Sequence, residues 1–212
     1  MDLFNTSPVV NLLPYDGTAD YYGKVFTIKE TQDYLDRLQT TIEWQNDEIV
    51  LFGKPIQTKR QVAWYGDEAY SYTYSKTTKL ALPWTPDLLA LKAKAEELSG
   101  ARYNSCLLNL YHNGDEGMSW HSDAEKELEK DGAIASFSFG ADRKFQFKHK
   151  HSGQRVDTLL ESGSLLVMRG PCQTFWLHAL PKTKKVTRPR VNLTFRTIAV
   201  ASATDPGAHM PV

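Results

Sequence analysis

The sequence predicts a mainly β fold with flanking helices, an α+β protein whose strands form an antiparallel sandwich or barrel. After Gly100, short segments rich in β-branched and aromatic residues follow one another, with turn residues between them. No long helical pattern intervenes, so a parallel sheet is not expected. Before Gly100, two segments carry the spacing and the capping residues of helices.

At 212 residues the chain is long enough for one well-packed globular domain, and we expect one. Its expected segments are an extended lead-in over residues 1–26, helices and hairpins over residues 27–100, a strand-rich core over residues 101–198 and a flexible tail over residues 199–212. Pro8, Pro14 and Gly17 interrupt any regular pattern in the lead-in. The tail is small and polar and contains Pro and Gly, which is typical of a frayed end.

Both helices are predicted from their ends. The first is expected to begin at Thr27, which forms a capping box with Glu30 ahead of leucines at helical spacing. The second is expected after Thr85, with Pro86 in the first helical position and Gly100 at the end. Between the helices, aromatic and β-branched residues alternate with turn signals, which favours hairpins.

Composition excludes several classes of protein. Lysine and arginine (25) balance aspartate and glutamate (25), so no global field draws nucleic acid, and any such binding requires a local patch. Cys106 and Cys172 are far apart and are interpreted as reduced thiols. The sequence shows neither a membrane span nor a basic segment followed by an apolar leader. We therefore expect no membrane association and a cytoplasmic location, or a nuclear one in a eukaryote.

A candidate metal site begins in the segment GMSWHSDAEKEL. His121 and Asp123 are two residues apart, so in an extended or tightly turned segment both project the same way. His178 comes much later, but an antiparallel barrel can bring it to the same end. Two imidazoles and one carboxylate form the facial triad of non-haem iron(II) oxygenases, which leaves positions open for a co-substrate and O2. The alternative is a polar surface turn and a hydrogen-bonded, semi-buried histidine.

The segment RPRVNLTFR, residues 188–196, alternates polar and apolar side chains. The polar row is Arg190, Asn192, Thr194 and Arg196, and the apolar row is Val191, Leu193 and Phe195. Successive side chains of a strand point to opposite faces, so only one row can face a given side. Taken alone, the segment favours a half-buried strand with its arginines in water. Beside an iron triad, the polar row is expected to face the interior instead.

An iron site of this kind needs an oxidisable co-substrate, usually the dianion 2-oxoglutarate. A carboxylate in a partly dry pocket must be paired, and the planar fork of arginine pairs it bidentately. Arg190 and Arg196 are roughly 20 Å apart along an extended strand, so both reach one diacid only if their side chains lean together. Asn109 and Tyr111, on one face of an earlier strand, are further candidates.

The motifs NLYHNGDEGMSWHSDAE, SFSFGADRKFQFKHK, LPKTKKV and RPRVNLTFR resemble the AlkB family of Fe(II)- and 2-oxoglutarate-dependent dioxygenases, and in particular its branch that repairs alkylated nucleic acid. The resemblance covers about residues 50–197. It implies a double-stranded β-helix, or jelly roll, as the catalytic core, with an N-terminal nucleotide-recognition lid. It implies His121, Asp123 and His178 as iron ligands and catalytic residues. It also implies a co-substrate site made of Asn109, Tyr111, Arg190, Asn192, Thr194 and Arg196, in which the arginines hold opposite ends of the diacid.

The lid motifs RQVAWYGD and SYTYS suggest contacts with substrate. The resemblance implies a base-facing group of Tyr72, Tyr74 and Ser75, an apolar wedge at Phe52 and a contact of Arg60 with the nucleic-acid backbone. Relatives commonly carry a second acidic residue directly after the iron-binding aspartate. Here Ala124 stands there and Glu125 follows, which makes Glu125 the candidate and leaves the range of lesions open.

The implied activity is oxidative demethylation, or dealkylation, of N-alkylated bases in single- or double-stranded DNA, with RNA as a further candidate. Fe(II), 2-oxoglutarate and O2 take part, and formaldehyde, succinate and CO2 are released. Candidate phosphate contacts are Lys144, Lys148, Lys150, Arg155, Lys182, Lys184, Lys185 and Arg188. We expect a monomer. The alternatives are an oxygenase of the same fold that acts on RNA or a small metabolite, and a non-enzymatic jelly-roll binding module.

Overall fold

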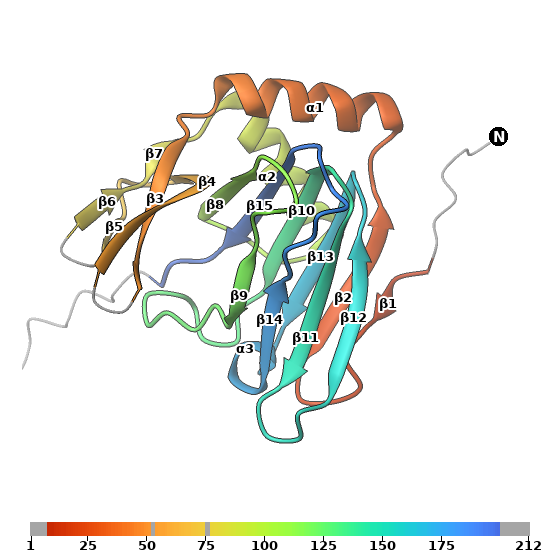
Figure 1. Cartoon of the computed structure of the whole chain (residues 1–212). Helices are drawn as coiled ribbons and strands as arrows, with labels where there is room; N and C mark the ends of the chain where they lie inside the picture. Colours follow the sequence, from red (N-terminus) through yellow and green to blue (C-terminus); the bar gives the residue numbers. More distant parts are fainter. Residues whose placement is uncertain (1–7, 52–53, 75–76, 200–212) are drawn as a thin grey trace, which may run out of the picture.

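The computed structural model of the chain describes residues 8–51, 54–74 and 77–199, and it shows two facing antiparallel sheets (Figure 1). In the described residues, the larger sheet runs in the order β1 (Val10–Asn11), β2 (Thr18–Lys24), β13 (Ser164–Arg169), β10 (Ile134–Gly140), β15 (Arg190–Arg196), β8 (Ser105–Tyr111), β4 (Lys54–Gly66) and β3 (Gln45–Leu51). The short strand β7 (Leu82–Pro83) pairs with β4 in parallel, whereas all the other pairs of this sheet are antiparallel. The smaller sheet runs in the order β12 (Arg155–Leu160), β11 (Arg143–His149), β14 (Trp176–Leu180) and β9 (Met118–His121). Strands β5 (Ser71–Tyr74) and β6 (Thr77–Leu80) pair with each other as a separate two-stranded sheet. This is the mainly β jelly roll with flanking helices that was predicted.

Helices α1 (Ile28–Thr41) and α2 (Pro86–Ser99) cover the outer face of the larger sheet, whereas α3 (Cys172–Phe175) is a single short turn before β14 (Figure 1). Thr27 caps α1 by accepting the Glu30 N–H, and the Glu30 carboxylate accepts the Thr27 N–H in return. Thr85 caps α2, and Gly100 ends it with a φ of +68°, a backbone conformation that glycine adopts without a steric penalty. The predictions for both helices are confirmed.

The two faces of β15 meet different surroundings. Val191, Leu193 and Phe195 are fully buried and pack in the core beneath α1 and α2. Arg190, Asn192 and Thr194 on the other face point into the space between the two sheets, where Arg190 is buried as well. The polar row therefore faces the interior of the jelly roll, as the iron-site interpretation required.

The N-terminal lead-in differs from the expectation. Residues Thr18–Lys24 form β2, which pairs antiparallel with β13 in the larger sheet. Gly17, with a φ of +122°, lies against the backbone of Cys172, where no side chain fits. This glycine allows the chain to turn closely into β2. Because β2 and β4 both lie in the larger sheet, that sheet is not confined to residues 101–198.

Among the described residues, no helix has both the length and the apolar character needed to cross a membrane. Both cysteines are buried free thiols, as expected.

Candidate metal and co-substrate site

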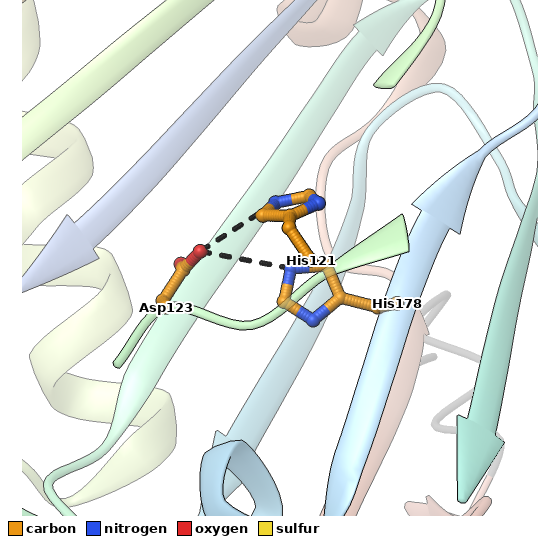
Figure 2. Close-up of side chains that lie close together, drawn as sticks. All are labelled: His121, Asp123 and His178. Carbon is orange, nitrogen blue, oxygen red and sulfur yellow. Dashed lines mark ion pairs between the residues drawn. The ribbon is translucent and has the colours of Figure 1, made fainter. Parts of the chain in front are cut away.

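Three side chains that can bind a metal converge at the edge of the smaller sheet. His121 ends β9 and lies directly across from His178 on β14, while Asp123 follows two residues after His121 (Figure 2). Asp123 Oδ1 is 3.6 Å from His121 Nε2 and 3.7 Å from His178 Nε2. The potential ligand atoms of the three residues all lie within 4.8 Å of one another. This arrangement suits one ion held on one face by two imidazoles and a carboxylate.

Neighbouring groups fix the orientation of these side chains. The His121 Nδ1 lies 2.8 Å from the Ser119 carbonyl oxygen; donation of its proton there leaves Nε2 as the free ligand atom. The Asp123 N–H donates to Gln173 Oε1 at 2.9 Å. The ring of Phe145 stacks on His178 with centroids 5.5 Å apart. The triad is therefore preorganised before any metal arrives.

The electrostatics favour the protonation state that metal binding requires. Burial alone would raise the pKa of Asp123, but the adjoining His178 and Arg196 outweigh it and hold that pKa well below its usual range. Burial, and then the neighbouring His178, lowers the pKa of His121. At neutral pH the carboxylate is charged and the His121 imidazole is neutral, and both are then ready to donate electron pairs to a cation.

The triad opens on a cavity of about 80 Å³ between the two sheets. Five predicted co-substrate residues line it together with the triad: Asn109, Tyr111, Arg190, Asn192 and Thr194. Apolar side chains complete the wall, namely Leu107, Met118, Phe145, Leu166, Met168 and Leu180. The cavity thus has the metal-binding triad at its opening, polar side chains of β8 and β15 on its floor, and apolar side chains on its walls.

Arg190 is a buried cation with no anionic partner in the part of the chain that the structure describes. It is 2 % exposed, its Nη2 donates to Ser138 Oγ at 2.9 Å, and its guanidinium lies 5.5 Å from the Tyr111 ring centroid. Its Nε has no hydrogen-bond partner, and no carboxylate in the described part of the chain forms an ion pair with it. Burial lowers its pKa to about 10. A carboxylate bound in the cavity would satisfy this charge, so these residues fit a diacid co-substrate.

The sequence matches the 2OG-Fe(II) oxygenase superfamily over residues 18–196. The chain belongs to this superfamily. DNA oxidative demethylase ALKBH2 from Mus musculus is 37% identical over 203 residues, which cover 91% of this chain and 85% of the relative. The human ALKBH2 is 38% identical over 194 residues, covering 86% and 74% of the two chains. Human alpha-ketoglutarate-dependent dioxygenase alkB homolog 3 is 39% identical over 187 residues, covering 84% and 65%.

These relatives place the oxygenase in the AlkB family, as the motifs indicated. A solved structure of OsALKBH1 shares the fold, with a TM-score of 0.57 at 16% identity over 84% of this chain and 97% of that chain. The chain is accordingly an Fe(II)- and 2-oxoglutarate-dependent dioxygenase that uses O2.

Arg196 lies at the metal end of the site, apart from Arg190. It does not line the cavity with Arg190; its Nη1 lies 4.0 Å from Asp123 Oδ2 and 3.4 Å from Glu125 Oε1. With Asp123 and Glu125 it borders a neighbouring cleft of about 370 Å³, between the loop over residues 124–133 and the end of β15. Arg190 and Arg196, six positions apart on β15, therefore lie in two adjoining spaces: Arg190 in the cavity and Arg196 in the cleft. Asp123 lines both spaces.

The predicted substrate contacts are placed unevenly. Arg60 is 8 % exposed and donates to Asn109 Oδ1 at the floor of the cavity, and its contact with a nucleic-acid backbone stays a prediction. Its strand, β4, pairs with β8, which brings the two residues together. Glu125 is exposed at the rim of the cleft. Tyr72 and Tyr74 lie on β5 in the separate two-stranded sheet. Phe52 and Ser75 lie outside the described residues.

Two residues near the site were not predicted from the sequence. Gln173 supports Asp123, but nothing in the segment GPCQTF signals that contact. Arg143 is buried beside Tyr111. It occupies a position that alternates with Phe145 and Phe147 on β11, so the two-residue period of a strand could have placed it inside.

Proposed function

We propose that this chain removes alkyl groups from damaged bases in DNA by oxidising the N-alkyl carbon, with release of formaldehyde, succinate and CO2. One observation carries the proposal: a triad suited to iron shares one cavity with a buried arginine that has no anionic partner among the described residues. Membership of the AlkB family and the names of the ALKBH2 and alkB homolog 3 relatives support the choice of substrate.

In this proposal His121, Asp123 and His178 hold the iron. Iron with 2-oxoglutarate and O2 supplies the oxidising power that hydroxylates the alkyl carbon. The protein's part is to fix the three ligands, keep Asp123 ionised and exclude water with the apolar wall of the cavity. The side chain of His121 is 37 % exposed, and that open side is where a flipped base would lie.

The co-substrate roles divide between the two spaces. Arg190, with Tyr111 and Asn192, would bind the carboxylate remote from the metal. Asn192 is held for this task by hydrogen bonds from its Nδ2 to Ser136 Oγ at 2.8 Å and to the Phe137 carbonyl at 2.9 Å. Arg196 would act at the metal end, where it neutralises Asp123. Asn109 and Thr194 would complete the polar floor.

Nucleic acid would be bound by the rim of the site and the lid. Glu125 is the candidate for reading the base, and Phe52, Tyr72, Tyr74 and Ser75 remain the candidates for the wedge and the base stack. Among the basic residues, Lys144 is paired with Asp157 at 2.6 Å, and Lys150 donates to the Gln173 carbonyl at 2.8 Å. The better phosphate contacts are therefore Lys148 and Arg155 on the smaller sheet and the run Lys182, Lys184, Lys185 and Arg188.

We further propose that the enzyme acts as a monomer on single- or double-stranded DNA, in the cytoplasm or the nucleus. RNA is a second substrate to be tested.

The deciding experiment uses protein loaded anaerobically with Fe(II) and 2-oxoglutarate. Aeration with oligonucleotides that each carry one defined methyl lesion should yield succinate and an unmodified base, followed by mass spectrometry. DNA and RNA of the same sequence, single- and double-stranded, separate the alternatives. His178→Ala should abolish turnover, whereas Arg102→Met, at a side chain that is 88 % exposed, should not change it. If no lesion is turned over, the proposed repair function is wrong. If no succinate is released under any condition, the chain is a jelly-roll binding module and not an enzyme.

A further inference from the structure

Arg143 is a second arginine sealed into the interior near the cavity. It lies on the inner face of β11 and is 1 % exposed. Its Nη2 donates to the carbonyl oxygens of Glu116 at 2.8 Å and Pro181 at 3.0 Å, and its Nη1 lies 3.4 Å from that of Asn113. These carbonyls belong to the connections after β8 and after β14. Arg143 thus ties together the two loops at one end of the cavity.

A structural tie alone does not explain a full positive charge at this position. No carboxylate in the residues described here forms an ion pair with Arg143, and its Nε has no hydrogen-bond partner. The Glu116 carboxylate accepts the His112 N–H at 3.1 Å and attracts Arg143 without forming an ion pair with it. Burial lowers the pKa of Arg143 despite the opposing attraction of Tyr111 and Glu116, so these groups offset only part of the cost of its charge. A buried charge held by carbonyl oxygens costs free energy that a neutral hydrogen-bond donor would not. The charge is therefore expected to serve something else nearby.

Tyr111 is the group that connects Arg143 to the cavity. The Arg143 guanidinium lies 5.8 Å from the Tyr111 ring centroid, and the Arg190 guanidinium lies 5.5 Å from the same centroid. Both distances are within the range of cation–π attraction. Tyr111 is 3 % exposed, lines the cavity and pairs across the strands with Arg190. No described residue hydrogen-bonds to its hydroxyl, which leaves that group for a ligand.

We propose that Arg143 is a positioning residue for the carboxylate of 2-oxoglutarate remote from the metal. It fixes the ring of Tyr111 and adds a second positive charge behind Arg190, so that the cavity selects a diacid over a 2-oxo acid with one carboxylate. This inference rests on the proposed function of the cavity. It assigns Arg143 no contact with the co-substrate itself.

The test compares two ligands that differ only at the remote end. Metal-loaded protein is titrated anaerobically with 2-oxoglutarate and with 2-oxopentanoate, which has a methyl group in place of the remote carboxylate. Binding is followed by the visible charge-transfer absorption that a 2-oxo acid produces when it chelates Fe(II). Arg143→Met should raise the Kd of 2-oxoglutarate about 5- to 30-fold, the range of a desolvated cation–π contact. The Kd of 2-oxopentanoate should stay within about twofold, since its binding lacks the remote contact.

Arg143→Lys keeps the charge but loses the planar fork, so its selectivity should fall between wild type and Arg143→Met. If Arg143→Met does not fold, Arg143→Lys replaces it in the test. An unchanged ratio of the two Kd values in Arg143→Lys would then refute the proposal. Equal weakening of both ligands, or of neither, would show a purely structural arginine. Arg102→Met serves as the exposed control. If wild-type protein itself gives no charge-transfer band, the proposed function fails; if the band forms but selectivity ignores Arg143, only this inference fails.

Discussion

Replacing Arg190 with methionine should change stability and co-substrate binding in opposite directions. This arginine is 2 % exposed, and Ser138 is its only side-chain hydrogen-bond partner among the described residues. Replacing a buried ion pair or triad by apolar side chains of similar volume is neutral or stabilises by about 1–4 kcal/mol in known cases, and we expect the same direction for a buried arginine without an ion-pair partner. Loss of the hydrogen bond to Ser138 costs about 1 kcal/mol. The ligand-free variant should therefore be unchanged or up to about 3 kcal/mol more stable.

Binding of 2-oxoglutarate should suffer. Removing one partner of a buried, hydrogen-bonded charge pair costs about 2–5 kcal/mol. At about 1.4 kcal/mol for each tenfold change, the Kd should rise about 30-fold to about 4,000-fold. Urea unfolding without ligand measures the first effect, and calorimetric titration of Mn(II)-loaded protein with 2-oxoglutarate measures the second.

Arg102→Met is the matched control, because its side chain is 88 % exposed and pairs with Glu96 outside the cavity. It should shift neither quantity appreciably, since exposed ion pairs contribute about 0–1 kcal/mol. A loss of more than about 2 kcal/mol of ligand-free stability in Arg190→Met would show that the charge supports the fold itself. An unchanged Kd would refute the assignment of Arg190 to the co-substrate.

Three further outcomes follow from the site. Gln173→Ala should weaken binding of Co(II) to the triad by about tenfold, the lower end of the effect of outer-shell partners, because Gln173 holds the backbone N–H of Asp123 and not its carboxylate; spectroscopic titration measures this. A divalent metal at 100 times its Kd should stabilise the protein by about 2.7 kcal/mol, a shift of about 5–11 °C in the unfolding temperature, and His178→Ala should remove that shift. Burial raises the pKa of Cys172 to about 12 and also raises that of Cys106, so neither thiol should react with a disulfide reagent at pH 8 until urea unfolds the chain.

Local signals were sufficient for the helices and for β15. The caps at Thr27 and Thr85 depend on residues three positions along, so they can be read without knowledge of the fold. The polar row of β15 was assigned to the interior only because His121 and His178 suggested an ion there. That assignment depended on chemistry, since periodicity alone leaves the inward face undecided.

Long-range contacts were beyond the sequence. The pairing of β2 with β13 joins segments about 140 residues apart, and neither segment carries a sequence signal that predicts its partner strand. The same holds for Gln173 below Asp123 and for the inward turn of Arg60 onto Asn109. Such contacts are set by how two sheets stack, whereas spacing along the chain reports only which residues share a face.

The distribution of charge explains why the cavity suits a ligand and not merely a core. Arg190 and Arg143 are both buried, and neither forms an ion pair with a carboxylate of the described residues, although Glu116 attracts Arg143. Arg196, in contrast, lies beside Asp123 and Glu125. The protein therefore neutralises its interior at the metal end and leaves excess positive charge at the remote end. A dianion that chelates the metal with one end would supply the missing negative charge at the other. The unbalanced charge would then determine both how strongly the co-substrate binds and which of its two ends faces the metal. The same unbalanced charge would lower the stability of the protein without co-substrate.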